Sequence, residues 1–460
     1  MKISIVLAAG EGTRMKSKLP KVLHPVAGKP MLGYIVDSCK DCGIDKTIVI
    51  VGYGSEKVKK VFADSEVIFR DQPVGEGIPY GTGFAVKQAI NDFEDEDTVI
   101  ILTGDTPLIQ SETLDSLIKE RESGNYAALV LTAIQENPFG YGRIIRGENS
   151  NIVKIVEEKD ANDKEKAVNE VNSGIFAFRG EDLKNALGKL STDNSQGELY
   201  LTDVIKILVE ERKKVGAHIL RNAQEMLGVN SKVQLAICEG EIRQNINNHH
   251  MLNGVTILDP RTTIIESEVE IGSDTVIYPG AILQGRTVIG KDCTIYGTTR
   301  VVDSTIGDHV ILDNVLVEES SVGDGSKLGP YAHLRPKSQI GKNTKIGNFV
   351  EVKNSVFGDG SKAGHLAYIG DADIGKDVNI GCGTIFVNYN GAEKFRTSVG
   401  DRAFIGSNSN LVAPLVVEED GYIAAGSTIT RKVEKGQLSI ERSRQKNLNG
   451  WVEKKGLKKK

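Results

Sequence analysis

Long hydrophobic runs, abundant cysteine and an excess of positive charge are all missing from this sequence of 460 residues. No segment approaches the roughly 18 apolar residues of a membrane span. The short apolar stretch at the amino terminus leads into glycines and charges, unlike a cleaved signal peptide. Five cysteines, an odd number in a long chain, do not make a disulfide framework. These absences predict a cytoplasmic protein without a membrane span.

The charge balance argues against another class of function. The chain has 57 lysines and arginines against 62 aspartates and glutamates, a net charge of −5, which disfavours bulk binding of nucleic acid but allows a local phosphate site. Cys39 and Cys42 form a Cys-x-x-Cys pair without a second pair, so we expect packed or surface thiols rather than a zinc site. We expect the basic tail (Lys454, Lys455 and residues 458–460) to be a solvated end, with an anionic partner as the alternative.

Up to about residue 227 the sequence alternates between strand and helix patterns. Alternation of this kind is typical of a three-layer α/β domain with a mostly parallel sheet. We therefore predict a Rossmann-like domain over residues 1–230. The predicted strands are residues 3–7, 47–51, 99–102, 127–132 and 175–178, and the predicted helices include residues 31–42, 83–91 and 111–122.

The next segment, residues 231–253, reads as one long helix. Apolar residues such as Val233, Ile237 and Ile242 recur among polar ones, and Asn253-Gly254 ends the pattern. We predict that this helix is an arm that connects two domains.

After Gly254 an aliphatic residue before glycine recurs, as at Ile271-Gly272 and Ile289-Gly290. These positions are 18 residues apart, and elsewhere the step is 6, as between Ile340 and Ile346. A hexapeptide repeat predicts a left-handed parallel β-helix over residues 254–460, with about nine or ten turns. On the residues alone, such a domain could be no more than an oligomerisation scaffold.

A glycine loop follows the first predicted strand. Ala8, Ala9, Gly10 and Gly12 come directly after the strand, and side chains this small let backbone N–H groups approach an anion. Arg14 and Lys21 add positive charge nearby, which suits a nucleoside triphosphate at the carboxyl end of the strand. The loop lacks the third glycine of a dinucleotide fingerprint and the Gly-Lys-Ser/Thr of a P-loop, so alone it could be an ordinary tight turn.

Two oxygen-bearing side chains are candidate metal ligands in this half. Asp105 follows an apolar strand in a glycine turn, and Mg²⁺ takes one or two carboxylates beside substrate phosphates. A turn or helix-capping aspartate is the alternative. Asn230 stands at the head of the long helix, where the residues alone favour a helix N-cap.

The whole opening string resembles the sugar-1-phosphate nucleotidylyltransferases, whose signature is Leu-x-x-Gly-x-Gly-Thr-Arg-Met followed by Pro-Lys. The resemblance implies that a sugar-1-phosphate oxygen attacks the α-phosphorus of UTP in line, with no protein nucleophile. It also makes Asn230 the second Mg²⁺ ligand beside Asp105. The implied nucleotide and sugar-phosphate contacts are Leu7, Ala8, Ala9, Gly10, Arg14, Lys21, Gln72, Gly81, Thr82, Gly140, Glu157, Asn172 and Asn230.

One departure from that family concerns the base. The family usually places a Gln five residues before Gly-Thr, but here that offset falls on Glu76, and the nearest glutamine is Gln72. Either an insertion loops out and leaves Gln72 in place, or the base is read differently. A glutamine offers uracil a donor and an acceptor, whereas an ionised glutamate offers only acceptors.

Charged side chains mark a second candidate site within the hexapeptide repeats. Arg335 and Lys353 are 18 residues apart, so successive turns stack two cations into an anion site suited to a sugar phosphate. His365 and Tyr368 follow. A lone histidine in a loop is usually solvated, but beside these residues we interpret His365 as a general base for an amine.

This half resembles the hexapeptide-repeat acyltransferases. Nearly the whole chain is similar to the bifunctional bacterial wall-precursor enzymes that join a glucosamine-1-phosphate N-acetyltransferase to an N-acetylglucosamine-1-phosphate uridylyltransferase. That family implies UTP and acetyl-CoA as co-substrates, His365 as the base, and a homotrimer with acetyl sites between neighbouring β-helices. The implied glucosamine-phosphate contacts are Arg335, Lys353, Tyr368 and Asn379, and the implied acetyl-CoA contacts are Cys382 (often Ala in the family), Asn388, Tyr389, Ser407, Ala425 and Arg442.

Two alternatives stay open on the sequence. The first is a nucleotidylyltransferase for another sugar-1-phosphate, with a β-helix that only assembles subunits. The second is a catalytically idle regulatory subunit of such an enzyme. His365 with Lys353 and Tyr368 argues against the first, and the intact Arg14, Lys21 and Asp105 argue against the second.

Overall fold

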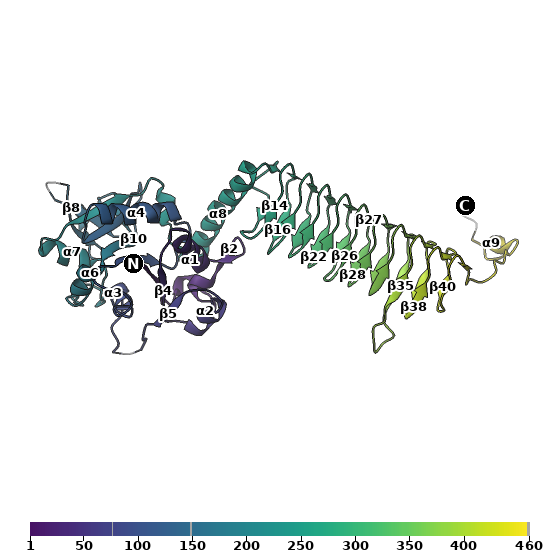
Figure 1. The fold of residues 1–460 in the computed structure, drawn as a ribbon, viewed down its shortest axis with the longest axis horizontal. Coiled ribbons are helices and arrows are strands. Elements are labelled where there is room, and N and C mark those ends of the chain that lie inside the picture. The colour runs from purple at the N-terminus through teal and green to yellow at the C-terminus, as the bar shows by residue number, and fades with distance from the viewer. Residues whose placement is uncertain (76, 148–149, 458–460) are drawn as a thin grey trace. The chain divides into compact units, whose positions relative to one another are not determined.

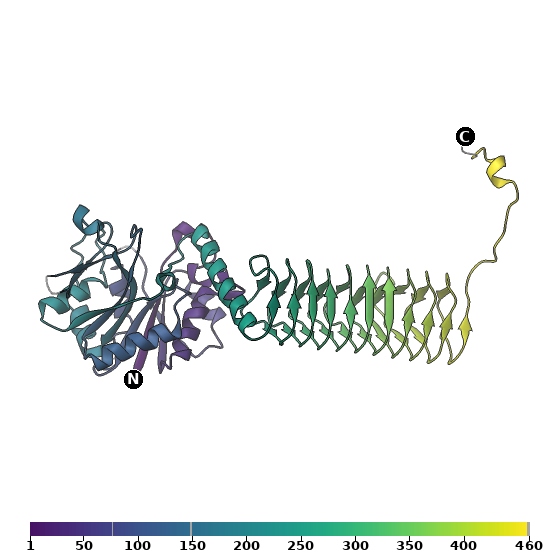
Figure 2. The same cartoon turned by 90° about the horizontal axis from the view of Figure 1, so that it is seen from above.

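The structure is a computed structural model that describes residues 1–75, 77–147 and 150–457. It divides into two compact units, Met1–Ile242 and Arg243–Lys460. Figures 1 and 2 show helices around a twisted sheet in the first unit and stacked short strands in the second. No helix among the described residues combines the length and the hydrophobicity that crossing a bilayer requires.

A central mixed sheet organises the first unit. Strand β1 pairs in parallel with β4 and β6, β4 pairs in parallel with β5, and β11 with β7, whereas β10 runs antiparallel to β6 and β7. Strands β8 (Arg143–Arg146) and β9 (Ile152–Val156) extend the sheet beyond β10. The main order is β11 (Val215–Ile219), β7 (Ala128–Ile134), β10 (Glu170–Arg179), β6 (Thr98–Thr103), β1 (Lys2–Ala8), β4 (Lys46–Val51) and β5 (Ile68–Asp71).

Both faces of this sheet are covered, which is why its central strands are apolar throughout. Ile3 and Ile5 of β1 pack on one side with α3 (Thr82–Lys87), α6 (Gly180–Leu187) and α7 (Asp203–Glu210). Val6 and Ala8 pack on the other side with α1 (Met31–Asp41), α2 (Ser55–Val61) and α4 (Ser111–Ser123). The predicted three-layer α/β domain is confirmed.

Short elements complete the first unit. They are η1 (Thr13–Met15), η2 (Lys21–Leu23), the hairpin of β2 (Pro25–Val26) and β3 (Lys29–Pro30), α5 (Asp163–Lys166) and η3 (Ala223–Met226). The helix predicted over residues 83–91 ends earlier, at Lys87, because the amides of Ala89 and Ile90 bond three residues back rather than four.

The long helix α8 covers Lys232–Leu252. Ser231 caps it, since its hydroxyl accepts the backbone N–H of Gln234 at 3.2 Å. The division between the two compact units falls inside this helix, at Ile242. The functional boundaries 1–230, 231–253 and 254–460 stay a prediction.

The second unit is a prism of parallel strands, as the hexapeptide repeat predicts. Its first face holds β12 (Thr256–Ile257), β15 (Val276–Ile277), β18 (Thr294–Tyr296), β21 (Ile311–Asp313), β24 (Lys327–Leu328), β27 (Lys345–Asn348), β30 (Lys362–His365), β33 (Asn379–Ile380), β36 (Phe404–Ile405), β39 (Tyr422–Ile423) and β41 (Leu438–Ser439). Its second face holds β13 (Ile264–Ile265), β16 (Ile282–Gln284), β19 (Arg300–Val302), β22 (Leu316–Glu318), β25 (His333–Leu334), β28 (Glu351–Lys353), β31 (Tyr368–Gly370), β34 (Ile385–Val387), β37 (Asn410–Val412) and β40 (Thr428–Ile429). Its third face holds β14 (Glu270–Ile271), β17 (Val288–Ile289), β20 (Thr305–Ile306), β23 (Ser321–Val322), β26 (Gln339–Ile340), β29 (Val356–Phe357), β32 (Ala372–Ile374), β35 (Thr397–Val399) and β38 (Leu415–Val417). A short helix, α9 (Trp451–Lys454), follows the prism.

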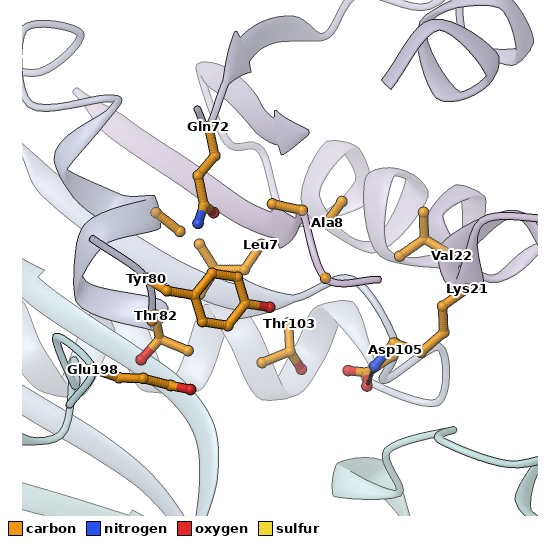
Figure 3. A pocket seen from close by; sticks show the side chains of 14 residues that line it. Leu7, Ala8, Lys21, Val22, Gln72, Tyr80, Thr82, Thr103, Asp105 and Glu198 are labelled. Carbon is orange, nitrogen blue, oxygen red and sulfur yellow. Dashed lines mark hydrogen bonds and ion pairs between the residues drawn. The ribbon is translucent and has the colours of Figure 1, made fainter. Parts of the chain in front are cut away.

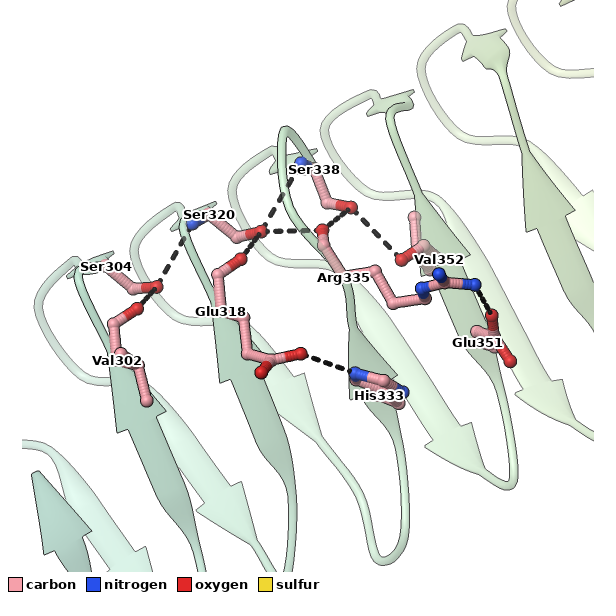
Figure 4. Close-up of polar contacts among 9 residues, drawn as sticks. All are labelled: Val302, Ser304, Glu318, Ser320, His333, Arg335, Ser338, Glu351 and Val352. Carbon is pink, nitrogen blue, oxygen red and sulfur yellow. Dashed lines mark hydrogen bonds and ion pairs between the residues drawn. The ribbon is translucent and has the colours of Figure 1, made fainter. Parts of the chain in front are cut away.

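One aliphatic residue per strand points inward, and these residues form a continuous buried column. Buried serines line the corners and satisfy backbone groups between coils: Ser304 accepts the N–H of Ser320 at 3.0 Å, and Ser320 that of Ser338 at 3.3 Å (Figure 4). The coil repeat is 17 or 18 residues until Asp373, whose partner on the next coil, Ser398, is 25 residues away. The extra residues form a loop, residues 388–396, between β34 and β35.

Candidate active sites

The first candidate site lies where β1 ends. A cavity of about 200 Å³ opens there, and its wall includes the residues predicted to cradle the nucleotide (Figure 3). The glycine loop is needed for this shape, because Gly12 has a φ of 65° and a Cβ there would lie 2.7 Å from Cβ of Lys21. The predicted residues that line the cavity are Leu7, Ala8, Ala9, Gly10, Lys21, Gln72, Gly81, Thr82 and Asp105.

Lys21 joins two residues that are remote in sequence. Its ammonium group bonds the carboxylate of Asp105, and it donates to the side-chain oxygen of Asn230 at 3.1 Å. The Lys21 and Asp105 side chains are only 16% and 13% exposed. The cap alternative for Asn230 is wrong, because Ser231 caps α8 and leaves the Asn230 oxygen aimed at this cation.

Asp105 and Asn230 thus present two hard oxygens to one positively charged atom. Mg²⁺ prefers such donors and takes few protein ligands beside phosphates, so the donor set fits that ion. Among the described residues no group of three or more His, Cys, Asp or Glu could hold a metal, and a site of this kind does not need one. The ammonium of Lys21 marks where a cation is favoured.

The predicted sugar-phosphate residues form a separate cluster beside the cavity. At Gly142 an added Cβ would lie 3.4 Å from a carboxylate oxygen of Glu157 and 3.6 Å from Cβ of Asn172, so these residues adjoin. Burial raises the pKa of Glu157, although its carboxylate accepts a hydrogen bond from Thr202 at 3.0 Å. Gly140 donates its N–H to Glu158 at 3.2 Å.

Not every predicted contact reaches the cavity. Arg14 is exposed in the loop after Gly12, and neither it nor the Gly140, Glu157 and Asn172 cluster lines the cavity wall. The Asn172 side-chain oxygen accepts the N–H of Gly174 at 3.0 Å, the turn that the residues alone suggested.

In the second unit, the predicted residues surround the second face of the prism. Arg335 follows β25 and Lys353 ends β28, and their coils are in an 18-residue register. The guanidinium group of Arg335 bonds Glu351 at 3.0 Å, and His333 bonds Glu318 at 3.0 Å in the same way (Figure 4). The two predicted cations therefore share one face, as the spacing indicated.

His365 lies at one edge of that face and Lys353 at the other. His365 ends β30 of the first face, at the corner before Tyr368 begins β31. Lys353 ends β28, at the corner before the third face. None of the hydrogen bonds among the described residues joins the exposed His365 to Arg335, Lys353 or Tyr368. One chain alone does not bring the predicted base to the predicted anion site.

The predicted acetyl-CoA contacts fall on both edges of the second face. Cys382, Ser407 and Ala425 each follow an inward-facing isoleucine and glycine or alanine on successive coils, so they stack at the corner that His365 shares. Arg442 reaches the same column, since its guanidinium group donates to the carbonyl of Ala425 at 2.7 Å. Asn388 and Tyr389 begin the loop at the opposite corner, and Asn379 lies on the first face beside Lys362.

Comparisons with known proteins decide the family. A family model described as a MobA-like NTP transferase domain matches residues 4–161, and one described as bacterial transferase hexapeptide (six repeats) matches residues 319–354. The bifunctional protein GlmU of Clostridioides difficile (strain 630) is 54% identical over 455 residues, 99% of this chain and 98% of that protein. The bifunctional protein GlmU of Clostridium novyi (strain NT) is 50% identical over 459 residues, 100% of both chains. The chain belongs to the GlmU family. It is an enzyme with a nucleotidyltransferase domain and a hexapeptide acyltransferase domain.

Within this member of the GlmU family, the departure near the base has a structural answer. Gln72 is 5% exposed, and its N–H bonds the carbonyl of Val51 at 2.7 Å, so it stays at the end of β5 and lines the cavity. The additional residues of this segment come after it. The alternative, Glu76, lies outside the described residues, as do Lys458–Lys460 of the basic tail.

Sequence reasoning missed several residues of the cavity wall. Thr103 ends β6 directly before the Gly104-Asp105 turn, and its place at a strand end was a usable signal. Tyr80 and Glu198 also line the wall, and burial raises the pKa of both groups. Glu198 approaches Gly81 only through the bond from the N–H of Leu199 to the carbonyl of Tyr80, at 2.8 Å, which no local pattern reveals. The remaining missed residues are Val22 and Ala85.

Proposed function

We propose that this enzyme acetylates glucosamine-1-phosphate with acetyl-CoA and then joins the product, N-acetylglucosamine-1-phosphate, to the uridylyl group of UTP. Full-length identity of 50–54% to bifunctional GlmU proteins supports both activities. The observation that carries the first-unit chemistry is the meeting of Lys21, Asp105 and Asn230 at the carboxyl end of β1.

For uridylyl transfer we assign positioning and charge neutralisation to the first unit. The amides of the Ala8–Gly10 loop and the cations Arg14 and Lys21 hold the triphosphate, while Gln72, Gly81 and Thr82 receive the nucleoside. The phosphate oxygen of the sugar forms a bond to the α-phosphorus as the bond to pyrophosphate breaks. The sugar contacts would come from the neighbouring Gly140, Glu157 and Asn172 cluster.

We propose Mg²⁺ as the metal of this site, held by Asp105 and Asn230. When bound, the ion neutralises charge that develops on the phosphate oxygens. Lys21 leaves Asp105 when the ion and the triphosphate enter, and its ammonium group then bonds phosphate oxygens instead. The short reach from Lys21 to both ligands supports this exchange.

For acetyl transfer we assign His365 as the base. The amine of glucosamine-1-phosphate attacks the thioester carbonyl, the carbon–sulfur bond breaks, and His365 takes the proton of the amine and passes it to the departing thiolate. Arg335, Lys353, Tyr368 and Asn379 would hold the sugar phosphate. The acetyl-CoA contacts would be Cys382, Asn388, Tyr389, Ser407, Ala425 and Arg442.

We further propose a homotrimer in the cytoplasm. The width of the second face separates His365 from Lys353 in one chain, so a complete acetyl site requires the His365 corner of one copy to face the Lys353 corner of another. A β-helix that packs side by side with its copies supplies such an arrangement.

A product assay tests the two activities separately. The purified protein with glucosamine-1-phosphate, acetyl-CoA, UTP and Mg²⁺ should release both free CoA thiol and pyrophosphate. We expect His365→Ala to lose only thiol release and Asp105→Ala to lose only pyrophosphate release. The controls are His309→Ala, an exposed histidine of the prism, and Asp115→Ala, an exposed carboxylate of α4. Absence of both products from the unmodified enzyme would refute the proposal.

A further inference from the structure

A buried carboxylate stands at the root of the loop that interrupts the β-helix. On most coils one or two residues turn the corner between the second and third faces, and Asp371 alone separates β31 from β32. On the next coil residues 388–396 fill the same corner between β34 and β35. Asp371 is 6% exposed, unlike Asp303, the exposed aspartate at the same corner four coils earlier. The loop therefore starts and ends against a charged group that has lost its contact with water.

Both ends of the loop are tied to Asp371. The side-chain amide of Asn388, where the loop starts, donates to Oδ2 of Asp371 at 2.5 Å. The backbone N–H of Thr397, where it ends, donates to the carbonyl of Asp371 at 3.1 Å. Asn354, one coil below, donates its side-chain amide to Oδ1 at 2.5 Å. Each carboxylate oxygen thus has its own amide donor.

The loop carries a second lysine to the predicted anion site. The ammonium of Lys353 beside it lowers the pKa of Lys394, so the two cations adjoin. None of the ion pairs among the described residues involves either lysine. Burial opposes the ionisation of Asp371, but its two amide donors, together with Lys353 and Lys394, hold the pKa of the carboxyl below its usual value. Because its oxygens are taken by amides, Asp371 balances the lysines without pairing with them, and both stay available to an anion.

Tyr368 belongs to the same cluster. The Asn388 amide also lies 3.4 Å from the Tyr368 hydroxyl. A Cβ at Gly370 would lie 2.6 Å from the Tyr368 ring and 2.9 Å from the Asn388 amide, so glycine leaves the space that these two side chains occupy. The position of Asn388 therefore affects a predicted sugar contact as well as the loop.

We propose that Asp371 is a positioning residue of the acetyltransferase site, which fixes Asn388 and the root of loop 388–396 and thereby holds Lys394 beside Lys353 for the phosphate of the sugar. This inference rests on the proposed acetyltransferase function. Asp371 does not touch the reacting atoms; it acts through Asn388 and the loop.

The test is an exchange of hydrogen-bonding roles in the full-length enzyme. Asp371→Asn has one oxygen and one NH₂ group, so it can accept from only one of the two amides, and the other meets a second donor. We expect KM for glucosamine-1-phosphate to rise about tenfold, the loss expected for one hydrogen bond to a charged group. Amide hydrogen exchange at Phe395 and Thr397 should accelerate, and uridylyl transfer should not change.

The double variant Asp371→Asn with Asn388→Asp restores one acceptor for every donor, so it should recover much of the KM and the slow exchange. Asp303→Asn, at the same corner but far from the loop, is the matched control. Failure of the double variant to recover, or a loss of activity without faster exchange in the loop, would overturn the inference. If the unmodified enzyme lacked acetyl transfer, the proposed function would fail, while the exchange measurements would still test the anchoring of the loop.

Discussion

Replacing Lys21 by methionine should move two properties of the first site in opposite directions. In the unliganded protein the Lys21 ammonium holds the place between Asp105 and Asn230 that we assign to Mg²⁺. Any cation that binds there must first displace it. Lys21→Met keeps the length and the packing of the side chain but removes the competing charge, so the free protein should bind Mg²⁺ more tightly while it turns over UTP more slowly.

The burial of the pair sets the size of both effects. The side chains are 16% and 13% exposed, so solvent screens them less than a surface pair. A hydrogen bond to a charged group contributes about 1.5–3 kcal/mol, and the variant does not have to give it up, which corresponds to roughly tenfold to hundredfold tighter binding of the ion. Loss of the cation from the phosphates in the transition state should lower turnover by about 10²–10³-fold.

Calorimetric titration of the full-length protein with Mg²⁺, without nucleotide, measures the first effect, and pyrophosphate release measures the second. Lys46→Met is the matched control, because Lys46 pairs with Asp92 at 3.5 Å, away from the cavity, with 26% and 8% exposure of the two side chains. Asp105→Asn should weaken the ion in either background. Unchanged or weaker Mg²⁺ binding by Lys21→Met would refute the assigned metal position.

Two further predictions concern the backbone and acid stability. Gly81→Ala should raise KM for UTP about tenfold or more, because Gly81 has a φ of 116° and a Cβ there would lie 2.5 Å from the carbonyl oxygen of Leu199; Gly197→Ala, with a φ of 65° but no neighbour within 4 Å, should cost only about 1 kcal/mol of stability and leave KM unchanged. Burial, aided by His249, lowers the pKa of His250 from 6.5 to about 4, so the unfolded chain binds a proton that the folded one excludes. The contribution of His250 to stability should be full above pH 6.5 and fall by roughly 3 kcal/mol as the pH drops to 4. Denaturant unfolding of His250→Asn should lack this loss, and an identical pH dependence in the two proteins would contradict it.

The architecture could be predicted from sequence because each of its patterns is local. Alternating strands and helices with apolar runs buried on both sides specify the three-layer unit. The recurrent aliphatic-glycine step specifies the prism, since each coil repeats the one before it. The interruption of that repeat at residues 388–396 and its root at Asp371 were not predicted, because the loop residues do not show what covers the corner below them.

The opening string from Leu7 to Lys21 and the stacking of Arg335 on Lys353 were determined by the sequence itself, through a motif and an 18-residue step. Tertiary structure alone decided that Asn230 faces Lys21 and not its own helix, that Gln72 remains in the cavity wall, and that His365 and Lys353 stand at opposite edges of one face. The physical reason is separation along the chain: Lys21 and Asn230 are 209 residues apart, and only the folding of the sheet brings their atoms within hydrogen-bonding distance.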